Sequence, residues 1–352
     1  MKLVRFGNPG AEKPGLVDEQ GGLRDLSGVI PDITSENLSR AVLEKLAGIS
    51  SSKLPLVDGT PRLGVPIATV GKFVAIGLNY ADHAAEANLQ LPSEPIVFQK
   101  AISSLSGPND PVVLPKDSRK SDWEVELGIV IGTQASYVER ADALAHVAGY
   151  CVVNDVSERE YQMERGGTWD KGKGCDSFGP VGPWLVTTDE ITDAQELDLW
   201  LDVNGQRMQQ GNTRTMIFDC AEIVSYVSRF MTLLPGDIIA TGTPPGVGMG
   251  PRGTAAGLSR SHGAREYWTA LACAPQRATP RRTKGRHPTK SLDLFDDPPT
   301  PDARGRAHAG RKGRAPCSFP DRSRPWRVGD AGYLDALCRL SVIDAGRNRA
   351  RP

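Results

Sequence analysis

The 352-residue sequence lacks several features that would assign it to a class immediately. No apolar run approaches the roughly 20 residues of a membrane-spanning helix. The first residues, Met1 to Gly7, lack the continuous apolar stretch of a signal peptide. The six cysteines show no Cys-x-x-Cys spacing, so we interpret them as reduced thiols and not as disulfides or metal ligands. These absences predict a soluble, cytoplasmic protein.

The net charge is zero, but the charges are unevenly distributed along the chain. Residues 1–250 carry 21 basic and 33 acidic side chains (net −12), whereas residues 251–352 carry 21 and 9 (net +12). The second segment holds 18 Arg to 3 Lys and is rich in Pro, Gly and Ala. Such a composition buries too little apolar surface to offset chain entropy, which predicts a disordered tail.

Two other interpretations of the tail remain. A basic tail can bind nucleic acid, but no aromatic interleaving or binding-module motif accompanies these arginines, which disfavours a nucleic-acid partner. Alternatively, residues 251–352 are read in the wrong frame of a GC-rich gene, because Arg, Ala, Pro and Gly codons dominate such sequence. A shifted frame around residues 266–272 permits a strand followed by a turn.

The rest of the chain divides at about residue 70. Residues 1–70 combine short apolar runs with many turn signals and predict a small N-terminal accessory domain. Residues 71–250 are denser, and their strands outnumber and do not regularly alternate with helices, which argues against a doubly wound parallel sheet. The fold class is therefore mixed α/β and strand-rich. Predicted core strands are 72–77, 96–99, 112–114, 124–131, 149–153, 197–203 and 237–240, and predicted helices are 81–86, 142–145, 158–164 and 220–230.

Three acidic residues are the strongest candidates for chemistry. Glu124 and Glu126 are two apart on a predicted strand, so they share a face. Adjacent carboxylates repel unless they are protonated or bridged by a cation, and Asp155 can complete an all-oxygen site for a hard divalent ion. Mg²⁺ is the first expectation, and its short bonds would require the three carboxylates to lie within roughly 5 Å of one another. The alternative for the pair is the solvated face of an edge strand.

Other polar residues are weaker candidates individually. His83 and Glu86 are neighbours on one helical face, which suits a general base held by a carboxylate and equally suits an ordinary surface pair. Lys173 lies among glycines, where it could approach a developing oxyanion, whereas Lys171 is expected to be solvated. The Gly-, Pro- and Thr-rich segment 241–248 could bind a carboxylate through its amides and hydroxyls, or form a simple turn.

The polar segments occur in the order Gly77-Leu-Asn-Tyr-x-x-His-x-x-Glu86, Phe98-Gln-Lys100, Asp122-Trp-Glu-Val-Glu-Leu127, Asn154-Asp155, Lys173-Gly-Cys-Asp-Ser-Phe-Gly-Pro180, Asn204-Gly205 and Thr241-Gly-Thr-Pro-x-Gly-Val247. Together they resemble the fumarylacetoacetate hydrolase family over residues 72–250. The resemblance implies a β-sandwich roll, usually a homodimer, in which Glu124, Glu126 and Asp155 bind Mg²⁺, with Mn²⁺ or Ca²⁺ as alternatives. It implies that His83 and Glu86 activate water, that Lys173 is the active-site lysine, and that Arg159 and Thr241 contact the substrate. The family's closing strands are absent after residue 250, which supports an out-of-frame tail.

The activity that this resemblance implies is hydrolysis of a carbon–carbon bond in a small 2,4-dioxo acid, such as 2,4-diketo-3-deoxy-L-fuconate, to pyruvate and a short acid. The metal would chelate the 1-carboxylate and the 2-oxo group, and His83 would deprotonate a water for attack at C4. The alternatives are an isomerase or decarboxylase of the 2-hydroxyhepta-2,4-diene-1,7-dioate type and a ureidoglycolate lyase. Outside enzymes, a metal or nucleic-acid binder and an inactive product of a damaged gene remain.

Overall fold

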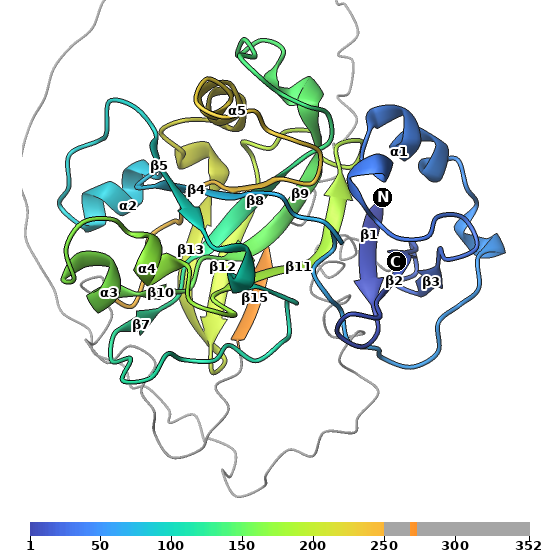
Figure 1. Cartoon of the computed structure of the whole chain (residues 1–352), viewed down its shortest axis with the longest axis horizontal. Helices are drawn as coiled ribbons and strands as arrows, with labels where there is room; N and C mark the ends of the chain where they lie inside the picture. Colours follow the sequence, from blue (N-terminus) through green and yellow to red (C-terminus); the bar gives the residue numbers. More distant parts are fainter. Residues whose placement is uncertain (250–267, 273–352) are drawn as a thin grey trace, which may run out of the picture. The chain divides into compact units, whose positions relative to one another are not determined.

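The computed structural model describes residues 1–249 and 268–272, and strands predominate in these residues (Figure 1). The mixed, strand-rich class predicted from the sequence is confirmed. The strands are β1 (Lys2–Phe6), β2 (Lys13–Val17), β3 (Leu23–Asp25), β4 (Phe73–Gly77), β5 (Ile96–Lys100), β6 (Leu105–Ser106), β7 (Ser121–Asp122), β8 (Val125–Ile131), β9 (Val147–Asn154), β10 (Ser157–Glu158), β11 (Gly179–Thr187), β12 (Asp198–Val203), β13 (Gln206–Asn212), β14 (Ile238–Ala240) and β15 (Trp268–Ala272).

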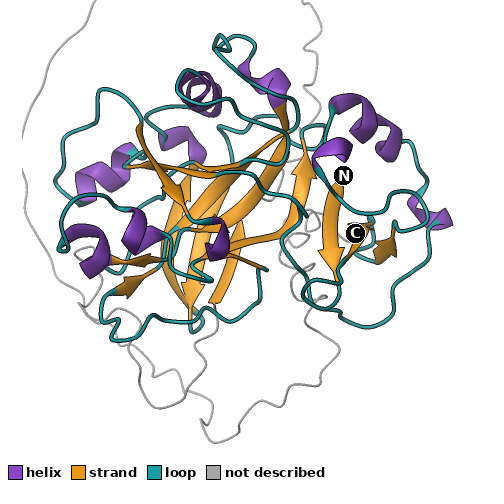
Figure 2. Ribbon diagram, viewed as in Figure 1, coloured by secondary structure: helices purple, strands orange, loops and turns teal. Residues whose placement is uncertain are grey.

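The helices are short and lie around the strands (Figure 2). The five α-helices of the described residues are α1 (Arg40–Ala47), α2 (Ala81–Glu86), α3 (Arg159–Met163), α4 (Asp170–Lys173) and α5 (Cys220–Ser228). Single 3₁₀ turns occur at Ser35–Asn37, Ser51–Lys53, Ile102–Ser104, Ala143–His146 and Thr213–Thr215. None of the helices in the described part of the chain is long and apolar enough to cross a membrane.

The main sheet has the strand order β3-β2-β1-β11-β9-β8-β14-β4-β5, with β6 paired to β11. Most neighbours are antiparallel, and the β14–β4 and β11–β6 pairs are parallel. The N-terminal strands belong to this same sheet, because Leu3 of β1 pairs with Leu185 of β11. The domain boundary expected near residue 70 therefore lies within a continuous sheet, and the assignment of residues 1–70 as a small accessory domain stays a prediction from the sequence.

Both faces of the central strands are buried, in two different apolar clusters. In β4, Val74 belongs to one cluster and Phe73 to the other, as the alternation of side chains along a strand requires. Helix α5 contributes Ile223 to the first cluster, and α1 contributes Leu43 to the second. Because they are covered on both sides, β8 and β9 are buried along their whole lengths. They form a rigid base for the polar residues at their ends.

Two smaller sheets complete the described fold. Strands β7 and β10 pair with each other, and β12 is flanked by β13 and β15. Strand β15 lies in the segment 251–352, which the composition had predicted to lack regular structure, and residues 268–272 pair with β12. The remaining predictions for this segment concern residues outside the described part of the chain.

Several predicted elements differ from the observed ones, and α1, α4, β13 and the two-residue strands β6, β7 and β10 were not predicted. Residues 112–114, predicted as a strand, have no regular structure, and prolines 111 and 115 flank them. Residues 142–145, predicted as a helix, form the 3₁₀ turn Ala143–His146. Strand β11 was not predicted at all because its sequence, GPVGPWLVT, begins with glycines and prolines that usually mark a turn.

Candidate active site

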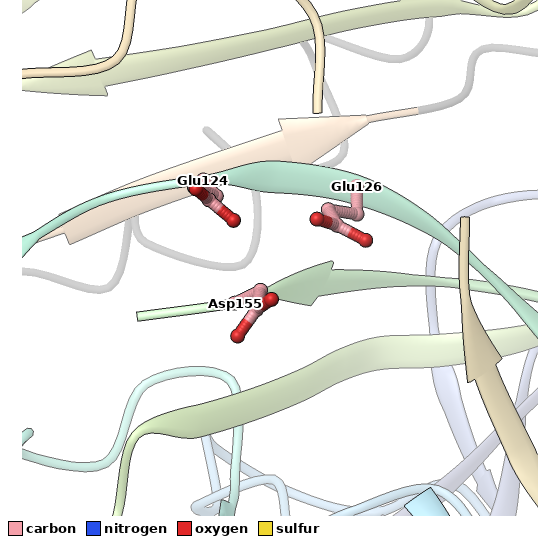
Figure 3. Close-up of side chains that lie close together, drawn as sticks. All are labelled: Glu124, Glu126 and Asp155. Carbon is pink, nitrogen blue, oxygen red and sulfur yellow. The ribbon is translucent and has the colours of Figure 1, made fainter. Parts of the chain in front are cut away.

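Three carboxylates meet at the ends of two neighbouring strands. Glu124 immediately precedes β8, Glu126 lies in β8, and Asp155 immediately follows β9. Figure 3 shows Glu124 and Glu126 along one stretch of chain, facing Asp155 at the end of the neighbouring strand. One carboxylate oxygen from each residue lies within 4.8 Å of those of the other two, and all three side chains are buried. This convergence agrees with the spacing expected of a shared cation site.

The pairing of β8 with β9 produces this convergence. Val125 pairs with Asn154, so the residues on either side of this pair are brought close together. The Asp155 amide donates to the Glu124 carbonyl at 2.8 Å, and the Glu124 amide donates to the Asn154 side chain at 3.1 Å. These hydrogen bonds fix the backbone around Glu124 against the backbone around Asp155, so that their carboxylates face each other.

Lysine side chains compensate part of this negative charge. Lys173, the last residue of α4, donates to Glu124 at 2.6 Å and to Asp155 at 2.9 Å, and it is only 2% exposed. Lys171 is exposed and donates to the Gly166 carbonyl at 2.9 Å. The structure therefore brings Lys173 to the carboxylates and leaves Lys171 outside, in the arrangement that the sequence favoured.

The structure adds a second lysine to which the sequence assigned no role. The Lys100 ammonium donates to the other Asp155 oxygen at 2.6 Å and to the backbone carbonyl of Lys173. Lys100 ends β5 and is only 2% exposed. The sequence offered no local signal for this contact, because the burial of Lys100 and its pairing with a residue 55 positions away are tertiary properties.

Arg159 also forms ion pairs with acidic residues of the site. It is the first residue of α3, and its guanidinium contacts Asp122 at 2.7 Å and Glu124 at 2.7 Å. A further hydrogen bond joins it to the Gln162 side chain at 3.0 Å. Asp122, which the sequence did not single out, also accepts the Gly248 amide at 2.6 Å. Arg159 is therefore fixed beside the site, and its contact with a substrate stays a prediction.

The two glutamates have opposite electrostatic environments. Burial and the neighbouring charges of Asp155 and Glu124 raise the pKa of Glu126 well above its ordinary value. Burial also acts to raise the pKa of Glu124, but Lys173 and Arg159 outweigh it and lower this pKa. In the described residues Glu126 has no ion-pair partner and accepts the Gly242 amide at 2.7 Å. A buried carboxylate with two carboxylate neighbours and no cation of its own fits a hard divalent ion, which takes oxygen ligands.

His83 and Glu86 lie together on α2. The His83 Nδ1 and Glu86 Oε2 atoms are 3.6 Å apart, and each side chain is 15% exposed. Within the described residues, His83 Nδ1 is buried without a hydrogen-bond partner. Glu86 also accepts the Gly246 amide at 3.0 Å, which ties α2 to the same 241–248 segment that contacts Glu126.

Thr241 connects this segment to β8. Its hydroxyl donates to the Leu127 carbonyl at 2.9 Å, its amide donates to the same oxygen at 3.0 Å, and the residue is fully buried. These bonds give Thr241 a role in anchoring the 241–248 segment. Its predicted contact with a substrate carboxylate stays a prediction.

Comparison with known proteins decides the family. The model for the fumarylacetoacetate hydrolase C-terminal domain matches residues 72–268. The chain belongs to the fumarylacetoacetate hydrolase family. A Burkholderia cenocepacia relative named "Putative hydrolase" is 62% identical over 250 residues, which cover 71% of this chain and 89% of that protein.

Solved structures of the family agree with this assignment. The fumarylacetoacetate hydrolase of Exiguobacterium antarcticum has a TM-score of 0.63 and 35% identity, covering 70% of this chain and 88% of that one. The 2-hydroxyhepta-2,4-diene-1,7-dioate isomerase of Mycobacterium marinum has a TM-score of 0.54 and 32% identity, covering 70% and 88%. The 5-carboxymethyl-2-hydroxymuconate delta-isomerase of Mycobacterium smegmatis has a TM-score of 0.55 and 34% identity, covering 70% and 89%. Family membership thus indicates an enzyme, and the related structures include both hydrolases and isomerases.

Proposed function

We propose that this chain is a divalent-metal-dependent hydrolase that cleaves a carbon–carbon bond in a small 2,4-dioxo acid of the diketo-deoxy sugar acid type. The products would be pyruvate and a short acid. The observation that carries the proposal is the buried Glu124, Glu126 and Asp155 cluster with Lys173 bonded to two of its members. These residues would hold the ion, which supplies Lewis-acid polarisation of a 2-oxo acid when bound.

The remaining roles follow from the chain's own side chains. His83, kept in place by Glu86, would accept a proton from the attacking water. Lys173 carries a positive charge into a buried site, because Asp155 and Glu124 outweigh the effect of burial and raise its pKa. That charge would stabilise the enolate that leaves as pyruvate. Arg159 and Thr241 are proposed to contact the substrate's anionic groups.

Isomerisation is the second candidate function. It is favoured by the similarity to the 2-hydroxyhepta-2,4-diene-1,7-dioate isomerase and the 5-carboxymethyl-2-hydroxymuconate delta-isomerase, each at above 30% identity. An isomerase would use the same acidic cluster and lysine to stabilise an enolate and would need no water attack. The presence of His83 as a candidate base does not distinguish hydrolysis from isomerisation, because either reaction needs a proton acceptor.

We further propose that the protein is a homodimer. In the described residues, β5 ends the order of the main sheet, and an end strand offers backbone groups for pairing. Apolar side chains are exposed in this region, with Ile96 at 37% and Ile102 at 44%. Sedimentation velocity on the purified chain tests this, and a single species of 37.8 kDa over a wide concentration range would contradict it.

The function is tested by assaying pyruvate release from a series of 2,4-dioxo acids with Mg²⁺ or with EDTA. We expect turnover that requires the metal and is lost in Asp155→Asn, while Lys171→Ala, which changes the neighbouring exposed lysine, retains it. Metal-dependent enol–keto exchange of 2-hydroxydienedioates without pyruvate would select the isomerase. Absence of both reactions with metal-loaded protein would refute the proposal.

A further inference from the structure

Gln209 is the one buried residue of β13, whose other residues are exposed or partly exposed. In β13 its side chain is fully buried, while Gln210 beside it is exposed. A primary amide has one oxygen that accepts and two N–H groups that donate, so burial is costly unless these are satisfied. The partners of Gln209 therefore indicate what holds it inside.

All of these groups have partners near the acidic cluster. The Gln209 oxygen accepts the Val125 amide at 2.8 Å. Its nitrogen donates to the Thr243 hydroxyl at 2.7 Å and to the Pro244 carbonyl at 2.9 Å. Val125 is the residue between Glu124 and Glu126, so Gln209 holds the backbone that separates two of the three carboxylates.

Thr243 closes a ring with the same residue. Its hydroxyl accepts from Gln209 and donates to the Val125 carbonyl at 2.9 Å. Both the N–H and the C=O of Val125 are thus bonded by two side chains that are also bonded to each other. Because each group has a partner, the ring is fully satisfied, which is the condition under which buried polar networks rigidify a structure.

The ring of hydrogen bonds formed by Gln209, Thr243 and Val125 lies beyond the last residues at which β8 pairs with β14. On this side of β8 the neighbour is β14, and its pairing ends at Gly128 with Ala240. The Thr241 amide still reaches the Leu127 carbonyl, but Val125 lies beyond the last paired residues. Two side chains from β13 and the 241–248 segment therefore replace a missing strand neighbour for Val125.

We propose that Gln209 is a positioning residue that sets the separation and direction of Glu124 and Glu126 for cation binding. The inference rests on the proposed function, because it assumes that these carboxylates hold a metal ion. Gln209 touches neither carboxylate, so it acts through the Val125 backbone and the Thr243 hydroxyl. Residues that orient metal ligands typically change metal affinity by 10–100-fold when they are replaced.

The test measures Mn²⁺ binding to the full chain, by electron paramagnetic resonance of free Mn²⁺, without any assay of turnover. Gln209→Met keeps the size and removes the hydrogen bonds, and we expect it to raise the Kd for Mn²⁺ by about 10–100-fold. Gln210→Met, the same change at the neighbouring exposed position, should leave the Kd unchanged. Circular dichroism at the binding temperature establishes that each variant is folded.

A second pair of variants separates positioning from stability. Thr243→Val removes the hydroxyl at constant size, and we expect it to weaken Mn²⁺ binding, whereas Thr243→Ser should restore binding. Since both residues belong to the same ring, the double variant Gln209→Met/Thr243→Val should lose less free energy of Mn²⁺ binding than the sum of the losses in the two single variants. If Gln209→Met does not fold, the comparison of Thr243→Val with Thr243→Ser tests the inference, because both of these variants keep Gln209.

The outcomes distinguish this inference from the proposed function. Folded Gln209→Met and Thr243→Val proteins with the wild-type Kd would overturn the inference, even if their melting temperatures fall. Wild-type protein whose Mn²⁺ binding is absent, or is unaffected by Glu126→Gln, would overturn the metal site and the proposed function with it.

Discussion

At the scale of single residues, Glu124 and Glu126 are the same residue type two positions apart, but they have different partners. Glu124 forms ion pairs with Lys173 and Arg159, whereas Glu126 receives one backbone N–H from Gly242. The protein's own cations therefore neutralise one side of the acidic cluster and leave the other uncompensated. Ionising a buried carboxylate that has no cation partner is costly, so the Glu126 side is where an added cation stabilises the site most.

His83 provides the first prediction. If it is the water-activating base, His83→Ala should lower turnover by about 10²- to 10⁴-fold, because a general base contributes a factor of that size. Mg²⁺ affinity should stay nearly constant, since His83 lies on α2 and is not one of the three acidic ligands. Steady-state kinetics and calorimetric titration of Mg²⁺ measure the two quantities. Unchanged turnover would instead assign His83 a structural role.

Lys100 provides the second prediction. Its buried ammonium is bonded to Asp155, so Lys100→Met leaves a buried carboxylate short of one cation. Breaking a buried ion pair in this way typically costs about 3–5 kcal/mol, which urea unfolding of the metal-free protein measures. Lys53→Met, at an exposed position, should change stability by less than about 0.5 kcal/mol. An equally small effect of Lys100→Met would show that Lys173 alone balances Asp155.

How far the sequence predicted the site depends on the range of each contact. Glu124 and Glu126 share a face through local spacing, whereas Asp155 was joined to them by its ligand chemistry and by the resemblance to a family, and not by any local pattern. The Lys100 contact joins residues 55 positions apart, and no local pattern reports such a pair. Gln209 likewise appears in sequence as one of two adjacent glutamines, and burial of one of them is a tertiary property.

At the scale of elements, strand β11 shows why glycine and proline mislead a local prediction. Its first five residues have the composition of a turn, but all nine residues of the strand are buried, and β1 and β9 flank it in the sheet. The close approach to β9 depends on Gly149, where an added Cβ would lie 2.1 Å from the Val186 carbonyl oxygen. Glycine here permits a tight strand contact, and the surrounding sheet overrides local propensity.

The turn between β2 and β3 provides a pH-dependent prediction. Asp18 accepts the Gly22 amide at 2.7 Å and the Arg24 side chain at 2.7 Å. Burial raises the pKa of Asp18, but these hydrogen bonds and the Arg24 charge outweigh it and lower the pKa. A lowered pKa means that the ionised form stabilises the fold above about pH 4, the ordinary pKa of aspartate, and that this stabilisation is lost as the pH falls further.

Asp18→Asn should therefore lower the free energy of unfolding by about 1–3 kcal/mol at neutral pH, since charged hydrogen bonds contribute about that much. The difference from wild type should shrink as the pH falls below about 4. Urea unfolding at a series of pH values measures it, with exposed Glu19→Gln as the control. A difference that is independent of pH would mean that the Asp18 charge contributes nothing.

At the scale of the whole molecule, the N-terminal segment and the core share structural elements. Leu3 pairs with Leu185 of β11 and packs in the same apolar cluster as Phe73 and Val153. The ion pair of Arg62 with Asp110 also crosses the boundary expected near residue 70, at 2.6 Å. A small domain with its own core would fold independently, whereas strands of a shared sheet should unfold together.

The last prediction follows from this shared core. Leu3→Ala removes a side chain that is 1% exposed and should lower stability by about 2–5 kcal/mol, the usual cost of such a cavity. Because residues 1–70 contain no tryptophan, fluorescence reports unfolding outside this segment, and hydrogen exchange of residues 2–17 reports unfolding within it. The free energy of unfolding that each signal reports should fall by the same amount in Leu3→Ala. It should stay unchanged in Leu56→Ala, since Leu56 is 57% exposed. If Leu3→Ala moved only the exchange of residues 2–17, residues 1–70 would be a separate folding unit, as their sequence alone suggests.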